Sequence, residues 1–249
     1  MAKIKYSLAV MGAGGTGSYF LKEISRQISS TPDIQKQISS MYICDGDIVE
    51  EKNLERQCFI MDDVGRSKAA VLGEVLNDTF SLNWQVLPSY VEKMETLYKL
   101  FPESDKIPEE DAATITIPII IGCVDNHGAR LLFEEFFNKA YNCIYFDAGN
   151  EFETGEVVFA YKLGGKVISP VRSHYFPEIK EGDTRSRSDI SCTELNNVAP
   201  QHIYTNMMAG LTLCSGFSSL MKNEPKCGLV FFNSKEMSCE FIPYTRESA

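Results

Sequence analysis

A glycine-rich turn, Gly12-Ala-Gly-Gly-Thr-Gly17, joins a strand-like run over residues 5–11 to a helical run over residues 15–29. Glycine permits positive φ and close backbone approach, and the N-terminus of a helix attracts phosphate. A strand, a glycine turn and a helix in this order are typical of the first unit of a nucleotide-binding α/β fold. Taken alone, this unit indicates a dinucleotide-binding Rossmann domain first.

Strand-like and helix-like segments go on alternating up to residue 150. We expect strands over 40–44, 83–87, 118–124 and 142–146, and helices over 65–77, 91–101 and 126–141. Such alternation predicts a parallel sheet with helices on both faces. Beyond Gly149 we expect an antiparallel strand over 156–161, a mobile crossover loop over 163–198, a helix over 200–221, and strands over 228–233 and 237–243.

The predicted fold class is therefore α/β, a Rossmann-like doubly wound sheet with a parallel N-terminal half and antiparallel C-terminal strands. We expect one domain over residues 1–249. Its nucleotide-binding half covers residues 1–150, and residues 151–249 supply the crossover loop, a helix and the last strands.

Charge and cysteine content exclude several kinds of protein. A formal net charge of −10 argues against nonspecific binding to nucleic acid or to an anionic membrane. The first apolar run is too short to span a membrane, and no signal peptide is visible, so we expect a cytoplasmic protein. The eight cysteines include no Cys-x-x-Cys pair, so we expect reduced thiols and no structural zinc.

The loop after the second strand narrows the kind of nucleotide site. It holds two carboxylates, two amides and a guanidinium, and a lysine follows near the start of the next helix: Asp45, Asp47, Asn53, Gln57, Arg56 and Lys68. A dinucleotide-binding domain expects one acidic residue there for the ribose, a role that Asp45 can fill. It has no need for the amides and the cations of this loop.

A third segment, Ile119-Ile-Ile-Gly-Cys-Val-Asp125-Asn126, ends a buried strand in a carboxylate and an amide. Ligands of doubly wound sheets bind at the carboxyl ends of the strands, so Asp45 and Asp125 should converge there with the glycine turn. A carboxylate facing phosphates indicates Mg2+, and Arg56 and Lys68 would offset phosphoryl charge. The segments together predict a site for a nucleoside triphosphate and magnesium.

Several motifs occur in one order over roughly residues 5–160. Besides the glycine turn they are Asp45-Gly-Asp47, Asn53-Leu-Glu-Arg56-Gln57, Val64-Gly-Arg-Ser-Lys68-Ala, Val124-Asp125-Asn126 with Arg130, Asp147-Ala-Gly149 and Thr154-Gly-Glu-Val157. This set resembles the ThiF/ubiquitin-activating-enzyme superfamily, and its overall look is similar to the short bacterial ThiF-like proteins of the PRTRC type.

The resemblance implies ATP- and Mg2+-dependent adenylation of the C-terminal glycine carboxylate of a small ubiquitin-like or sulfur-carrier protein. It implies that Asp45 contacts the ribose, that Asn53, Arg56 and Lys68 lie near the phosphates, and that Asp125 is linked to Mg2+. It also implies that the remaining cofactor-binding residues are Gly12, Gly14, Gly15, Gly17, Asp47, Gln57 and Asn126. A homodimer is implied by resemblance only, and a conjugating enzyme is left open as a further partner.

Cys192 is the candidate nucleophile, because a thiolate readily takes an acyl group from an adenylate. Cys192-Thr193, Pro200 and His202 resemble the Cys-Thr, Pro and His of the crossover in ubiquitin-activating enzymes. A packed free cysteine at this position would have no catalytic role.

Three of the polar residues also have a purely structural interpretation. Asp47 could only cap the loop, Gln57 could only brace the backbone, and Arg130 could be a surface or ion-pairing residue. The whole chain could be a nucleotide-binding scaffold without turnover, or an NAD-dependent oxidoreductase.

Overall fold

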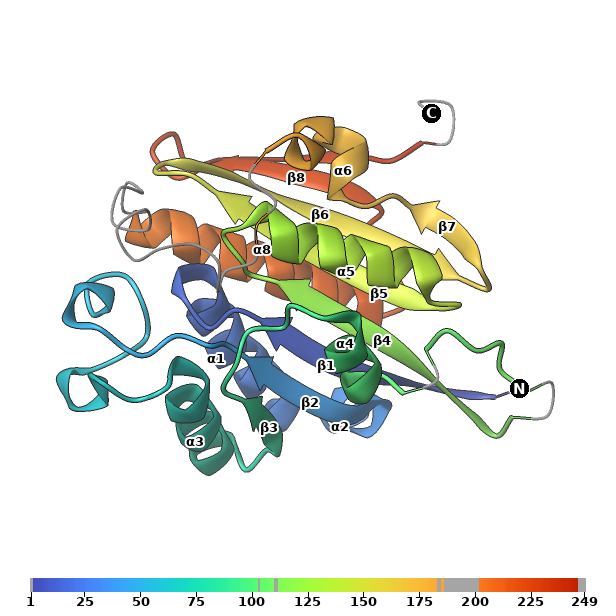
Figure 1. The fold of residues 1–249 in the computed structure, drawn as a ribbon, viewed down its shortest axis with the longest axis horizontal. Coiled ribbons are helices and arrows are strands. Elements are labelled where there is room, and N and C mark those ends of the chain that lie inside the picture. The colour runs from blue at the N-terminus through green and yellow to red at the C-terminus, as the bar shows by residue number, and fades with distance from the viewer. Residues whose placement is uncertain (1, 103, 110–111, 183–184, 186–201, 246–249) are drawn as a thin grey trace.

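The computed structural model describes residues 2–102, 104–109, 112–182, 185 and 202–245. Within them the chain forms one mixed sheet of nine strands with helices on both faces (Figure 1). The strands are β1 (Lys3–Met11), β2 (Ile38–Cys44), β3 (Trp84–Leu87), β4 (Thr114–Gly122), β5 (Cys143–Asn150), β6 (Thr154–Leu163), β7 (Lys166–Ser169), β8 (Gly228–Asn233) and β9 (Ser238–Pro243).

The strand order is β3-β2-β1-β4-β5-β6-β8-β9, with β7 paired to β6. Strands β1 to β5 pair in parallel, and β6 to β9 extend the sheet in antiparallel pairs. Strand β1 lies between β2 and β4. The strands that follow it in sequence are added first on one side, as β2 and β3, and then on the other side, from β4 onward. The predicted fold class, a doubly wound sheet with antiparallel C-terminal strands, is confirmed.

Helices cover the two faces of the sheet unequally. They are α1 (Gly15–Ser30), α2 (Pro32–Gln37), α3 (Lys68–Phe80), α4 (Met94–Leu100), α5 (His127–Lys139), α6 (Arg172–Tyr175) and α8 (Ile203–Met221), with short 3-10 turns η1 (Glu51–Asn53), η2 (Met61–Asp63) and η3 (Pro177–Lys180). Residues of α1, α3 and α8 pack in one apolar core, around Phe20, Leu72 and Phe217. Residues of α4 and α5 pack in the other, around Leu97 and Phe136.

No helix in the described part of the chain is both long and apolar enough to cross a membrane. Helix α8 packs beside α1 although the two are far apart in the sequence (Figure 1). This contact brings the start of α8 close to the glycine turn that opens α1.

The prediction of a mobile loop over 163–198 is wrong for its first part. Gly164 and Gly165 take positive φ and turn the chain, so that β7 pairs with β6, and α6 and η3 follow. The predicted start of the helix over 65–77, which is α3 in the structure, is also too early. Gly65 has φ +85°, and Ser67 caps α3 by accepting a hydrogen bond from the backbone N–H of Ala70 at 3.4 Å.

Candidate functional site

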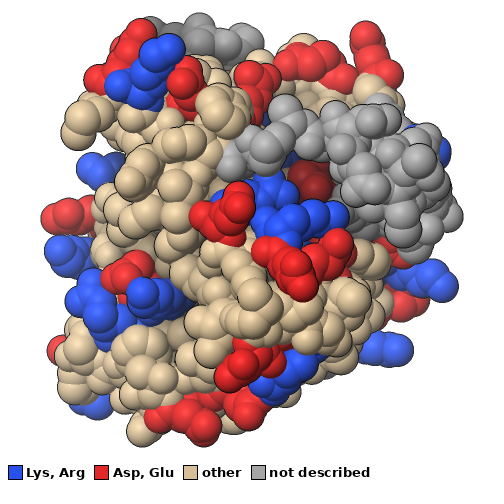
Figure 2. Space-filling view, turned by 90° about the vertical axis from the view of Figure 1, so that its left-hand side faces the viewer, with Lys and Arg blue, Asp and Glu red and all other residues tan. Residues whose placement is uncertain are grey.

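A cavity of about 1120 Å³ opens at the carboxyl ends of the parallel strands. Predicted residues from all three sequence segments line it: Gly12, Gly14, Gly15, Asp45, Asp47, Asn53, Arg56, Gln57, Lys68, Asp125 and Asn126. Figure 2 views this side of the molecule and shows Lys and Arg side chains gathered at its middle, with Asp and Glu around them. The structure therefore brings these predicted residues together, while Gly17 does not line the cavity and Cys192 lies outside the described residues.

The glycine turn has a shape that only glycine allows. Gly12 has φ +99°, and a Cβ there would lie 2.5 Å from the carbonyl oxygen of Cys123. A Cβ at Gly17 would lie 1.9 Å from the carbonyl oxygen of Gly12, so Gly17 lets the helix pack against the turn. Gly14 is the N-cap of α1, with no side-chain cap and no acidic residue in the first turn. The backbone N–H groups at this end of α1 are thus available to an anion.

Asp45 ties the end of β2 to the glycine turn. Its side chain is buried, at 7% exposure. One carboxylate oxygen accepts the backbone N–H of Ala13 at 2.6 Å, and the other accepts the N–H of Asp47 at 2.7 Å. Burial raises the pKa of Asp45, while Lys68 and the two backbone hydrogen bonds act in the opposite direction.

Asp47 and Lys68 form an ion pair on the cavity wall. Lys68, 5% exposed, donates from Nζ to Asp47 Oδ2 at 2.9 Å. The hydroxyl of Tyr90 donates to the other oxygen of Asp47. The ring of Tyr90 packs where a Cβ of Gly46 would stand. Asp47 therefore does more than cap its loop, and Tyr90 is a cavity residue that no motif or spacing pointed to.

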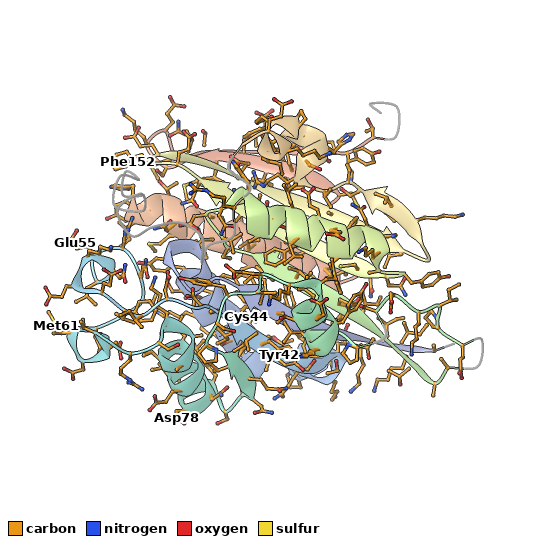
Figure 3. The ribbon with its side chains drawn as sticks, viewed as in Figure 1. Tyr42, Cys44, Glu55, Met61, Asp78 and Phe152 are labelled. Carbon is orange, nitrogen blue, oxygen red and sulfur yellow. The ribbon has the colours of Figure 1, made fainter. Side chains whose placement is uncertain are left out.

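The rest of this loop holds its shape through Asn53. The side-chain oxygen of Asn53 accepts the backbone N–H of Glu50 at 2.8 Å, inside the turn η1. Arg56 is half-buried and lines the cavity. Figure 3 shows Glu55 and Met61 at the outer end of the loop, away from Cys44 at the end of β2. The outer residues of the loop thus lie away from the end of β2, while Arg56 lines the cavity.

The β4 and β5 ends form the opposite wall. Asn126 caps α5 by accepting the backbone N–H of Ala129 at 2.8 Å. Arg130 is buried and donates from Nη2 to the carbonyl oxygens of Val124 at 2.8 Å and Ala148 at 3.1 Å. Its Nε lies 3.4 Å from Asp147 Oδ2. Arg130 is therefore an ion-pairing residue and not a surface residue. Its side chain links the ends of β4 and β5 beside Asp125.

A second buried arginine, Arg172 on α6, was not predicted. It is 3% exposed, donates from Nε to the carboxylate of Asp147, and donates from Nη1 to Glu156 Oε1 at 2.5 Å. Its guanidinium lies 5.2 Å from the ring centroid of Phe176. Arg172 and Phe176 both line the cavity. This ion pair therefore fixes the segment of α6 and η3 as a wall of the site.

Two thiols, Cys44 and Cys123, also line the cavity. Burial raises the pKa of Cys44 to about 12 and that of Cys123 further still. Both are thiols rather than thiolates at neutral pH, so neither is suited to take up an acyl group.

The residues present fit a nucleotide with magnesium. Among the described residues, no group of three or more His, Cys, Asp or Glu could hold a metal by itself. Mg2+ is commonly bound by one or two carboxylates together with substrate phosphates, and Asp125 lies on the wall of this cavity. The uncapped end of α1, Arg56 and Lys68 supply groups of the opposite charge for those phosphates.

Comparisons with known proteins agree with this geometry. A model of the ThiF family matches residues 3–247. Ubiquitin-like modifier-activating enzyme 5 of Oryza sativa subsp. japonica is 28% identical over 137 residues, which are 54% of this chain and 30% of the enzyme. The Arabidopsis thaliana protein of the same name is 27% identical over 139 residues, with the same coverage. This chain thus matches under a third of the length of these relatives.

Solved structures share the fold. E. coli MccB in complex with AMPCPP and MccA superposes with a TM-score of 0.64 at 17% identity, over 98% of this chain and 64% of MccB. PaaA gives a TM-score of 0.61 at 14% identity, over 96% of this chain and 64% of PaaA. At these identities the likeness concerns the fold.

Proposed function

The chain belongs to the ThiF family, and we propose on that basis that it is an ATP-dependent adenylyltransferase. Its substrate in this proposal is the C-terminal glycine carboxylate of a small ubiquitin-like or sulfur-carrier protein. The observation that carries the proposal is the convergence of Arg56, Lys68 and Asp125 in one cavity at the uncapped end of α1. MccB, which has the same fold, has been solved with ATP and with MccA.

The side chains have distinct roles in this proposal. Each oxygen of Asp45 accepts one backbone N–H and keeps a second lone pair, which can accept a ribose hydroxyl. Arg56, Lys68 and the N–H groups of α1 bind phosphate oxygens, while Asp47 holds Lys68 in place. When bound, Mg2+ held by Asp125 would neutralise phosphate charge.

The proposed reaction is a displacement at phosphorus. One oxygen of the carrier's carboxylate attacks the α-phosphorus of ATP, and the bond from that phosphorus to the oxygen bridging to the β-phosphate breaks. Pyrophosphate leaves with the electron pair, and the acyl group is left bonded to AMP. Because negative charge grows on the departing oxygen, cationic groups such as Arg56 and Lys68 lower the barrier. Capture of the acyl group by Cys192, with release of AMP, is a further step of the proposal.

An ATP–pyrophosphate exchange assay tests this function. Labelled pyrophosphate should enter ATP only when a Gly-terminated carrier protein is present, and a carrier without its last glycine is the matched control. Calorimetry with ATP and with NAD separates an adenylyltransferase from an oxidoreductase and a scaffold. Tight binding of NAD would support an oxidoreductase, and ATP binding without exchange for any carrier would support a scaffold. The homodimer, the single domain over 1–249 and the cytoplasmic location stay predictions.

A further inference from the structure

Asn206, on the first turns of α8, lies against the glycine turn. It is fully buried and lines the same cavity as Gly14 and Gly15. Its Oδ1 accepts a hydrogen bond from Asn150 Nδ2 at 2.8 Å. Asn150 Oδ1 in turn accepts from the hydroxyl of Thr16 at 3.3 Å. This series of hydrogen bonds orients both amides and leaves the Nδ2 group of Asn206 on the side away from Asn150.

That Nδ2 group is a buried hydrogen-bond donor. It has no hydrogen-bond partner among the residues that the structure describes. A Cβ on Gly15 would lie 2.4 Å from it, so glycine at position 15 is what allows the amide to stand beside the first residue of α1. Buried polar groups are rarely left without a partner, and such a group beside a cavity indicates a ligand atom. An N–H donor requires an acceptor on that ligand.

The position of this donor indicates which atom of the ligand accepts the hydrogen bond. The backbone N–H groups at the start of α1 have no side-chain cap, so they favour an anion at the same point. Ala13, in the same turn, donates its backbone N–H to Asp45, the residue that the proposed function places at the ribose. The phosphate directly bonded to the ribose is the α-phosphate, which therefore falls closest to the turn.

We propose that Asn206 is a phosphate-binding residue whose Nδ2 donates a hydrogen bond to a non-bridging oxygen of the nucleotide α-phosphate. The inference rests on the proposed function, because it takes an adenine nucleotide as the ligand. In the attack by the carrier's carboxylate, this hydrogen bond holds the α-phosphorus against the turn and withdraws negative charge from its oxygen. Asn206 thus adds a side-chain donor to the backbone donors of α1.

Calorimetric titrations of adenosine, AMP and ATP test the assignment. Asn206→Asp keeps the side-chain shape and an acceptor for Asn150 but replaces the N–H donor by a carboxylate oxygen. A hydrogen bond to a charged group corresponds to about ten- to a hundredfold in affinity. Asn206→Asp should therefore lower the affinity for AMP and for ATP by at least about that factor and leave the affinity for adenosine unchanged. Asn206→Ala, which adds no charge, should weaken AMP and ATP in the same sense.

Asn138→Asp is the matched control, because it makes the same chemical change at an exposed position of α5. It should leave all three affinities as in the wild type. Equal losses for adenosine, AMP and ATP in both Asn206 variants would show a purely structural role and overturn the proposal. Asn206 variants with unchanged AMP affinity and a raised KM for the carrier in pyrophosphate exchange would also overturn it. In that case Nδ2 would bind the carrier's carboxylate and not the phosphate.

The two proposals fail in different ways. If the wild-type protein binds neither AMP nor ATP, the proposed function is wrong. If the wild type binds both and the Asn206 variants bind them equally well, only the role of Asn206 is wrong.

Discussion

Replacing Arg172 by methionine tests how the wall of the cavity is held in place. The change removes the cation between Asp147 and Glu156 and keeps an apolar stem of similar length. Removing one partner of a buried ion pair costs about 3–5 kcal/mol, because the remaining charge stays buried. Asp147 keeps Arg130, whose Nε lies 3.4 Å away, and the side chain of Glu156 is 23% exposed. We therefore expect the lower end, a loss of about 3 kcal/mol.

That loss is large beside the stability of about 5–15 kcal/mol typical of a folded domain. Urea unfolding at neutral pH should show a lower midpoint with an unchanged slope, and the melting temperature should fall by roughly 6–12 °C. Arg172→Lys, which keeps the charge and loses the forked donors, should cost only about 1–2 kcal/mol. Adding Asp147→Asn to Arg172→Met should recover part of the loss. A loss of less than about 1 kcal/mol in Arg172→Met would show that this ion pair does not hold the wall in place.

Three further changes probe the site. Asp125→Ala should abolish pyrophosphate exchange while the urea midpoint stays near that of the wild type; exchange at the wild-type rate would remove Asp125 from the mechanism. Cys192→Ala should leave exchange intact and remove any thioester seen on a non-reducing gel, and if neither changes, Cys192 is not the nucleophile. Burial raises the pKa of Asp45 in the folded protein above its ordinary 3.8. The folded state therefore binds the carboxyl proton more tightly than the unfolded state does. Because of this difference, the wild type loses stability as the pH rises through the folded pKa. The stability of the wild type relative to Asp45→Asn, from urea unfolding, should therefore be greater at about pH 5 than at about pH 7, and the opposite trend would contradict it.

The local parts of the fold were predictable because short-range chemistry fixes them. Strand β1 and helix α1 follow their predicted ranges to within two residues, since the glycine turn marks the end of one and the start of the other. The start of α3 was missed by three residues, because the positive φ of Gly65 and the cap by Ser67 outweighed the apolar pattern. The parallel half of the sheet followed from the alternation of strands and helices, and the antiparallel extension followed from the change of pattern after Gly149.

The parts of the site that escaped prediction depend on contacts between distant residues. Asn150 and Asn206 are 56 positions apart, and Arg172 and Asp147 are 25 apart, with no motif that joins them. Only the packing of α8 beside α1, and the hydrogen bonds from Arg172 on α6 to β5 and β6, bring these groups to the cavity. Asn206 is the one amide side chain in α8, a helix without charged residues, and this was the available signal; spacing could not say what the amide faces.

Attack of a carboxylate on the α-phosphorus of ATP in this cavity would transfer one carboxylate oxygen to AMP, and isotope labelling detects that transfer. A Gly-terminated carrier protein labelled with 18O in its C-terminal carboxylate is incubated with ATP, and the adenylate is then cleaved with hydroxylamine. We expect one 18O atom in the released AMP and none in pyrophosphate. AMP free of 18O, or 18O in inorganic phosphate, would contradict it.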